Sequence, residues 1–200
     1  MSAREVVVST IRDEHRSLGA VTEALQRLLA DVAAQHAEPD FALFSAALCY
    51  IADFPERCHH PKEDEYLFKA LRGRTADFNA VLDELQAEHI RGAHMLDQLQ
   101  RALVHFQGGV PGGLGLFRTA VDAYSATLGE HMRKEEDLLE QVRDRLTEED
   151  WSRMALAFDA NDDPLFGGNR REGFRRLYVR IFNLLPRRLK KTTQHPRPGA

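Results

Sequence analysis

Two histidines and three carboxylates lie within seven consecutive residues, His59-His60-Pro61-Lys62-Glu63-Asp64-Glu65. The segments on both sides of this stretch have apolar, helical patterns. Burying so many polar groups costs free energy unless the groups are paired or bind a metal. If the stretch is helical, His59 and Glu63 lie one turn apart on the same face. The two side chains are then placed to bind a cation together.

A single histidine also lies within the apolar stripe of three other predicted helices, which gives the set His15, His59, His89 and His131. Two of the four are followed, one helical turn later, by a carboxylate, Glu63 and Glu135. Taken singly, such a histidine is more often a hydrogen-bonded core residue than a ligand. One on each of four helices is seldom an accident, so the joint pattern predicts a metal site.

The number and type of donors favour two metal ions. Four imidazoles and two carboxylates are more donors than one tetrahedral zinc ion takes. Carboxylates can bridge two ions, and nitrogen and oxygen donors without thiolate suit iron, manganese or zinc. We therefore predict a dinuclear non-haem iron centre, with manganese or zinc as alternative metals. His60 lies about 100° around the helix from His59, so it could reach the same centre, and the sequence leaves open which is the main ligand.

Four long helices are predicted to carry these residues. The first begins between Ser2 and Thr10, which both start a capping-box pattern, and extends to about residue 32. The second covers about residues 41–67 with a kink expected at Pro55, the third residues 78–106 and the fourth residues 117–142. This order predicts an all-α fold, an up-down four-helix bundle over residues 1–146.

Residues 147–200 are predicted to form a C-terminal helical extension and tail that packs on the bundle. A short fifth helix opens at residues 147–150. A basic amphipathic helix follows, because residues 170–191 hold nine Arg or Lys against one Glu. Its apolar side favours packing onto the acidic bundle, and the alternative is a peripheral anionic surface or a protein partner.

The overall composition excludes several classes of protein. The chain of 200 residues is 43% hydrophobic with a formal net charge of −4, so it is not a polycation that binds nucleic acid. No apolar run approaches the length of a membrane span, and residues 1–10 lack a secretory signal. Cys49 and Cys58 are nine residues apart on one predicted helix, too far for a disulfide, which fits a reducing cytoplasm.

The histidine and glutamate motifs resemble those of the hemerythrin-like, or HHE cation-binding, family. The resemblance covers roughly residues 8–146 and rests on four motifs: Glu14-His15, the run from His59 to Glu65, Glu88-His89, and His131-x-x-x-Glu135. It implies a bundle that holds two iron ions bridged by an oxo or hydroxo group and two carboxylates. By this resemblance the ligands are His15, His59, Glu63, His89, His131 and Glu135, with Glu63 and Glu135 as the bridges.

Two positions depart from the pattern of oxygen-carrying hemerythrins. Those proteins have a histidine four residues after the third-helix histidine, where this chain has Ala93. They also have Asp five residues after the fourth-helix histidine, whereas here Glu135 is at four and Glu136 at five. One iron would then have fewer ligands unless His60 supplies the missing imidazole. The resemblance is therefore closer to the bacterial hemerythrin-like subgroup than to simple oxygen carriers.

Glutamates precede three of the four histidines, as Glu14, Glu88 and Glu130. A metal-bound imidazole usually donates its other N–H to a carboxylate or carbonyl, so these glutamates are expected as acceptors from neighbouring helices. The alternative is that they are solvated flanking residues. Tyr124, seven residues before His131, faces inward and would either border the centre or pack in the core.

These observations lead to three functional hypotheses. The first is an iron-binding protein that binds O2, peroxide or NO in sensing, storage or a stress response. The second is a di-iron oxidoreductase that turns over peroxide or NO, or oxidises Fe(II). The third is a metal-free helical scaffold that uses its basic tail to bind a partner. The sequence does not decide whether the protein is an enzyme.

Overall fold

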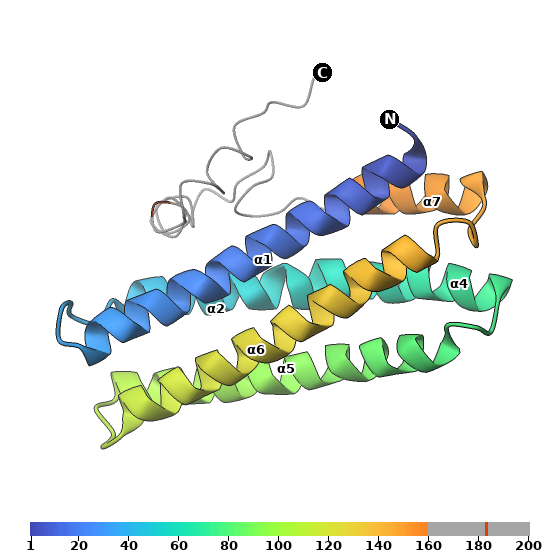
Figure 1. Cartoon of the computed structure of the whole chain (residues 1–200). Helices are drawn as coiled ribbons and strands as arrows, with labels where there is room; N and C mark the ends of the chain where they lie inside the picture. The colour runs from blue at the N-terminus through green and yellow to red at the C-terminus, as the bar shows by residue number, and fades with distance from the viewer. Residues whose placement is uncertain (160–182, 184–200) are drawn as a thin grey trace.

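The computed structural model describes residues 1–159 and residue 183, and the described residues contain helices but no strand. Helix α1 covers Ala3–Ala33, α5 covers Asn79–Gln107 and α6 covers Gly113–Gln141. The second rod of the bundle is a succession of short helical segments, α2 (Phe41–Asp53), η1 (Pro55–His59), α3 (His60–Lys62), η2 (Glu63–Phe68) and α4 (Lys69–Arg74). Figure 1 shows these four rods running alternately up and down. The predicted all-α helical bundle is confirmed.

Local sequence signals fix where the first two rods begin. Ser2 rather than Thr10 caps α1, because the Glu5 N–H donates to Ser2 Oγ and the Ser2 N–H donates to Glu5 Oε2, at 3.2 and 2.8 Å. This is a complete capping box. Asp40 caps α2 by accepting the N–H of Leu43 at 3.1 Å.

Two π-helical turns, η1 and η2, interrupt the second rod where its ligand-type residues lie. Pro55 has no N–H to donate and its ring disfavours a regular helix, and η1 begins at this residue. The N–H groups of Cys58 and His59 both donate to the carbonyl of Phe54, at 2.9 and 3.0 Å. Such π-turns often occur at functional sites. Here two adjacent histidines lie at the end of η1 and the start of α3, before η2, and both are buried: His59 is 1% exposed and His60 5%.

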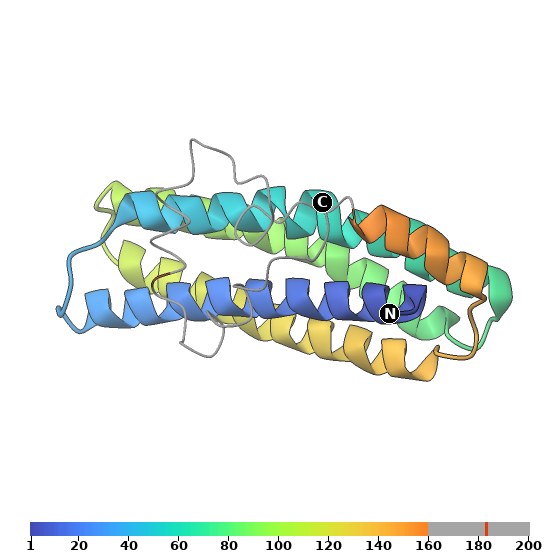
Figure 2. The same ribbon diagram turned by 90° about the horizontal axis from the view of Figure 1, so that it is seen from above.

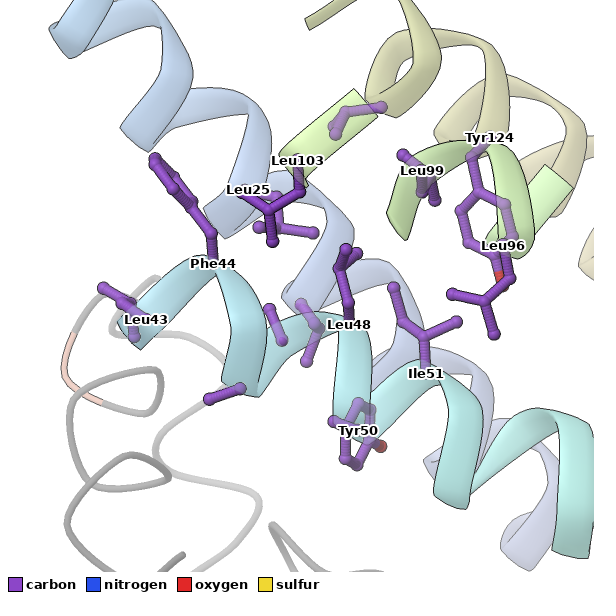
Figure 3. Packing of buried hydrophobic residues seen from close by; sticks show 14 of the residues in the cluster. Leu25, Leu43, Phe44, Leu48, Tyr50, Ile51, Leu96, Leu99, Leu103 and Tyr124 are labelled. Atoms are coloured by element: carbon purple, nitrogen blue, oxygen red, sulfur yellow. The ribbon is translucent and has the colours of Figure 1, made fainter. Parts of the chain in front are cut away.

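The apolar core is divided into two clusters. The α2 cluster is centred on α2 and includes Leu18, Leu25, Phe44, Leu48, Ile51, Leu96, Leu99, Leu103, Tyr124 and Leu128; Figure 3 shows its packing. The α7 cluster lies toward the other end and includes Val7, Ile11, Leu67, Phe68, Leu71, Leu85, Leu138, Trp151, Met154 and Phe158. Along each rod a histidine lies between members of the two clusters. The bundle therefore has a polar layer between two apolar ones.

Helix α7 (Glu148–Asp159) packs against α1 and η2, beside the end of the bundle where α4 lies (Figure 2). Trp151, Met154 and Phe158 are each 1% exposed and belong to the α7 cluster. Asp150 accepts the N–H of Thr147 at 3.0 Å and pairs with Arg74 of α4, with Nε and Oδ2 2.9 Å apart. These contacts tie the start of α7 to the bundle.

Apart from residue 183, the basic helix predicted at residues 170–191 lies outside the described residues. A domain boundary between residues 146 and 147 therefore stays a prediction. Among the described helices, none combines the length and the apolar character needed to cross a membrane.

Candidate metal centre

Four imidazoles, one from each rod, converge in the polar layer. His15, His59, His89 and His131 are between 1% and 7% exposed. The Nε2 atoms of His89 and His131 are 3.2 Å apart. All four Nε2 atoms point toward two buried carboxylates, Glu63 from η2 and Glu135 from α6, which are 0% and 1% exposed.

These six side chains form two donor groups that have both carboxylates in common. The first donor group consists of His15, His59, Glu63 and Glu135, and the second of His89, His131, Glu63 and Glu135. Within each group, one ligand atom from every residue lies within 4.8 Å of all the others. In the first group His15 Nε2 is 3.2 Å from Glu135 Oε2, and His59 Nε2 is 3.4 Å from Glu63 Oε1.

The second group is similarly compact. His131 Nε2 lies 3.1 Å from Glu135 Oε1, and His89 Nε2 lies 3.4 Å from the same oxygen. The other carboxylate reaches this group as well, with Glu63 Oε2 3.6 Å from His89 Nε2. Each carboxylate therefore directs one oxygen toward each group, the arrangement that a bridging carboxylate requires.

His60 shares a donor set with the two histidines of the second group. Its ring stacks on that of His89, with centroids 4.3 Å apart and an interplanar angle of 13°. Together with His89 and His131 it forms a third set of donors within 4.8 Å of one another. Neither ring nitrogen of His60 has a hydrogen-bond partner. The structure thus brings both histidines of the second rod to the centre, His59 on one side and His60 on the other.

A ring of outer carboxylates holds the four imidazoles. The Nδ1 atom of His59 lies 2.7 Å from Glu14, that of His89 lies 3.3 Å from Asp64, that of His131 lies 3.0 Å from Glu88, and that of His15 lies 3.3 Å from Glu136. Each of the first three rods thus contributes one carboxylate to the histidine of the next rod in chain order. The fourth rod contributes one to the histidine of the first rod. Because a carboxylate only accepts, each Nδ1 must donate, which leaves the Nε2 lone pair for a metal in the neutral ring.

The sequence identifies only part of this outer ring. Glu14 and Glu88, expected as acceptors, do accept from histidines of neighbouring rods. Glu130, also expected, lies exposed on the surface of α6 and contacts no histidine. The structure uses Asp64 and Glu136 instead. Asp64 and Glu136 each follow directly after an inward-facing glutamate, so their side chains lie about 100° around the helix and face an adjacent rod. This position after an inward-facing glutamate is the sequence signal that could have identified them.

Tyr124 is buried in the α2 cluster, 3% exposed, and its hydroxyl has no hydrogen-bond partner. It also lines a small pocket together with His60 and His131. The sequence left two alternatives for Tyr124, core packing or a place beside the donor groups. In the structure Tyr124 does both. Burial raises the pKa of Tyr124, so the phenol stays protonated.

The pKa values of the two shared carboxylates are shifted in opposite directions although the groups lie side by side. Burial, and then the charge of Glu135, raises the pKa of Glu63 well above its usual range. Burial also opposes ionisation of Glu135, but hydrogen bonds from His131 and His15 hold its pKa well below the usual range. The surroundings thus disfavour the charged form of one of the two buried carboxylates and favour that of the other.

Two of the imidazoles are held in the protonated form. Burial disfavours a charged His15, but hydrogen bonds to Glu135 and Glu136 raise its pKa to about 9. Burial likewise opposes protonation of His89, and hydrogen bonds to Asp64 and Glu135 raise its pKa to about 9. These protons offset the negative charge that a metal cation would otherwise neutralise.

The remaining shifts have the opposite sign. Burial, reinforced by the charge of His15, lowers the pKa of His59 well below its usual range. Burial also lowers the pKa of His60 to about 4, although Glu56 opposes this change. Both rings are therefore neutral near pH 7, the form in which an imidazole binds a metal.

Four buried atoms of this cluster lack a hydrogen-bond partner, namely both ring nitrogens of His60 and both oxygens of Glu63. Leaving a buried polar group unsatisfied costs about 1–3 kcal/mol each. The unsatisfied atoms are imidazole nitrogens and carboxylate oxygens, which are ligands for iron, manganese or zinc. The residues present therefore fit a metal-binding centre, because a cation would satisfy donors that the protein leaves open.

Comparison with known proteins agrees with this geometry. Residues 6–142 match the family model described as hemerythrin HHE cation binding domain. The match includes all four rods and ends before α7. No curated protein and no solved structure matches the chain.

Proposed function

Because the chain belongs to the hemerythrin HHE cation binding domain family, we propose that its polar layer binds two iron ions as a non-haem di-iron centre. The observation that carries the proposal is the pair of donor groups with Glu63 and Glu135 in common. Two metals held between the same two carboxylates would use all six inner side chains at once. Manganese and zinc are alternative occupants, since they accept the same donors.

The proposed ligands divide between the two ions. His15 and His59 would hold one ion, and His89 and His131 the other, with His60 as an additional ligand of the second. Glu63 and Glu135 would bridge the two. The outer carboxylates keep each Nδ1 protonated and each Nε2 directed inward, and the flanking apolar clusters keep bulk water from the layer.

We further propose that the centre serves to bind a small ligand, O2, peroxide or NO, in sensing, storage or a stress response. The iron ions would supply the affinity for these ligands and their redox chemistry. The chain itself supplies a buried site in which outer carboxylates hold the imidazoles of His15, His59, His89 and His131 at Nδ1. The two cysteines, Cys49 and Cys58, are free, which supports the proposal that the protein works in the cytoplasm.

The second candidate is a di-iron oxidoreductase that turns over peroxide or NO, or oxidises Fe(II). The observation in its favour is the small pocket that reaches His60 and His131 beside the second donor group. Steady consumption of peroxide or NO by the iron-loaded protein, lost in His131→Ala, would establish turnover. Stoichiometric binding without consumption would exclude it.

Elemental analysis tests the metal centre directly. Untagged protein, His89→Ala and the matched control His94→Ala would be loaded anaerobically with Fe(II) and desalted. His94 lies on the same helix but is exposed and contacts none of the donors. We expect two irons per chain in the wild type and the control, and a clear loss in His89→Ala. Absence of bound metal in the wild type would contradict the proposal.

Thermal unfolding separates the proposal from a metal-free scaffold. A ligand that binds only the folded state stabilises it by about 2.7 kcal/mol at a hundredfold excess over its Kd. Loading with iron should therefore raise Tm, and a chelator should reverse the rise. An unchanged Tm after loading and chelation would favour the scaffold hypothesis.

A further inference from the structure

A small chamber adjoins the second donor group and lies between η1, α5 and α6. Its lining includes Glu56, His60, Gly92, Tyr124 and His131. Gly92 leaves room for the carboxylate of Glu56, because a Cβ at position 92 would lie only 3.3 Å from Glu56 Oε1. We call this space the Tyr124 chamber. Two of its lining residues, His60 and His131, are members of one donor set, so a molecule in the chamber would lie directly beside that set.

Polar atoms without partners line the Tyr124 chamber. The Tyr124 hydroxyl, Glu56 Oε1 and both ring nitrogens of His60 have no hydrogen-bond partner. His60 Nδ1 lies 3.8 Å from the other oxygen of Glu56, Oε2. The side chain of Glu56 is 13% exposed, Tyr124 is 3% exposed and His60 is 5% exposed. Figure 3 shows the Tyr124 hydroxyl pointing from α6 into the bundle near Leu96. A buried site with several unsatisfied polar atoms is built for a polar guest.

The size of the chamber limits that guest. The free space measures about 20 Å³, whereas one water molecule needs roughly 10–15 Å³ by the same kind of measure. There is therefore room for a molecule of one or two non-hydrogen atoms. An organic substrate does not fit.

The hydrogen-bonding groups that line the Tyr124 chamber distinguish between the candidate ligands O2, NO and peroxide. The Tyr124 hydroxyl can donate a hydrogen bond, and a carboxylate oxygen of Glu56 can accept one. A guest that satisfies both must accept one hydrogen bond and donate another. O2 and NO have no hydrogen to donate, whereas hydrogen peroxide, like a water molecule, can donate and accept at once. Among the three candidate ligands of the centre, only peroxide therefore satisfies both wall atoms.

We propose that the Tyr124 chamber is a binding site for hydrogen peroxide beside the second donor group, with Tyr124 donating to the peroxide and Glu56 accepting from it. This inference rests on the proposed di-iron function and specifies which small ligand the site takes and on which side. Tyr124 and Glu56 act here as ligand-binding residues.

Azide titration tests the position of the chamber without relying on turnover. Azide accepts hydrogen bonds and gives absorption bands when it binds ferric iron, so its Kd can be read optically on the iron-loaded protein. We expect Tyr124→Phe to weaken azide about tenfold, the factor that corresponds to about 1.4 kcal/mol. The matched control Tyr50→Phe removes a hydroxyl from another buried tyrosine, which Figure 3 shows on a different side of α2, and should leave the Kd unchanged.

A second variant tests the assignment of peroxide. Glu56→Gln removes the charged acceptor that a protic guest needs but azide does not. We expect azide to bind this variant at least as tightly as the wild type. The second-order rate of the spectral change with hydrogen peroxide should fall about tenfold, the same factor of 1.4 kcal/mol. Glu130→Gln, at an exposed glutamate of α6, is the control.

The outcomes distinguish the failure of each proposal. Full iron occupancy with the same azide Kd in Tyr124→Phe and wild type would overturn the chamber as the ligand site. A normal peroxide rate in Glu56→Gln, with azide still sensitive to Tyr124→Phe, would overturn the assignment of peroxide. An iron-free wild type would overturn the proposed function, and this inference with it.

Discussion

The two donor groups have the same two carboxylates in common but differ in their surroundings. In the first, His15 and His59 meet edge to face with centroids 5.1 Å apart, and each Nδ1 faces an outer carboxylate. In the second, His89 and His131 are held in the same way, but a third imidazole, His60, stacks on His89 and the Tyr124 chamber adjoins them. We therefore extend the proposal: an ion in the first group would be structural, and an ion in the second group would bind the small ligand.

Removal of a shared carboxylate should have the largest effect on metal content, because each shared carboxylate faces both groups. We expect Glu63→Ala to lose both metals, since each oxygen of Glu63 faces a different group. Elemental analysis after anaerobic loading measures this loss. Glu65→Ala, at an exposed neighbour paired with Lys69, is the control and should retain both metals. One metal retained in Glu63→Ala would show that the carboxylate serves a single ion.

The histidines should distinguish the two groups. His15→Ala leaves the first group with one imidazole, and we expect it to lose one of the two metals. His60→Ala leaves His89 and His131 in the second group, so both metals should remain while azide affinity changes. The measurement is metal content together with azide titration of each variant. Equal metal loss in the two variants would contradict the proposed asymmetry, because His60 would then be as necessary as His15.

Much of this centre follows from helical periodicity. The apolar stripes along the four predicted helices select the histidines that the structure brings together, because a side chain within such a stripe must face the bundle axis. The same reasoning gives the inward-facing Glu63 and Glu135, each one turn after a histidine. It works because α1, α5 and α6 are regular over about 30 residues each.

Other features of the centre depend on information that periodicity lacks. The π-turns after Pro55 change the phase of the second rod, so counting in steps of 100° does not decide between His59 and His60. The outer ring depends on which rods are neighbours. Periodicity gives the face of a helix but not its partner, so Asp64 and Glu136 were missed and the exposed Glu130 was included.

The dependence of metal affinity on pH reports on one protonated imidazole in each group. His15 and His89 both have a pKa raised to about 9 by the carboxylates that face them. A metal must displace these protons, so apparent affinity should rise between pH 6.5 and 9. The increase should approach about tenfold per pH unit for each ion, because each group holds one such proton.

The stability of the metal-free protein should change in the opposite direction. A histidine whose pKa is raised on folding stabilises the fold fully below its unfolded value of about 6.5, and this contribution disappears as the pH rises through about 9. The difference in Tm between iron-loaded and metal-free protein should therefore grow over the same range. Chelator competition and thermal unfolding at several pH values measure both effects. Affinity independent of pH would mean that both imidazoles are already neutral in the metal-free protein.

Substitution of an outer carboxylate should have the smallest effect on metal affinity. Because each outer carboxylate supports one histidine, these variants also compare the two groups one ligand at a time. Removing such a partner of a metal-bound histidine typically costs about 10- to 100-fold in metal affinity. Glu14→Gln weakens the support of His59 in the first group, and Glu88→Gln does the same for His131 in the second. His60 can act as an additional ligand in the second group. We therefore expect metal affinity to fall more in Glu14→Gln than in Glu88→Gln. Chelator competition would measure the two affinities, with the exposed Glu130→Gln as control, and equal losses would indicate that His60 contributes nothing to metal binding.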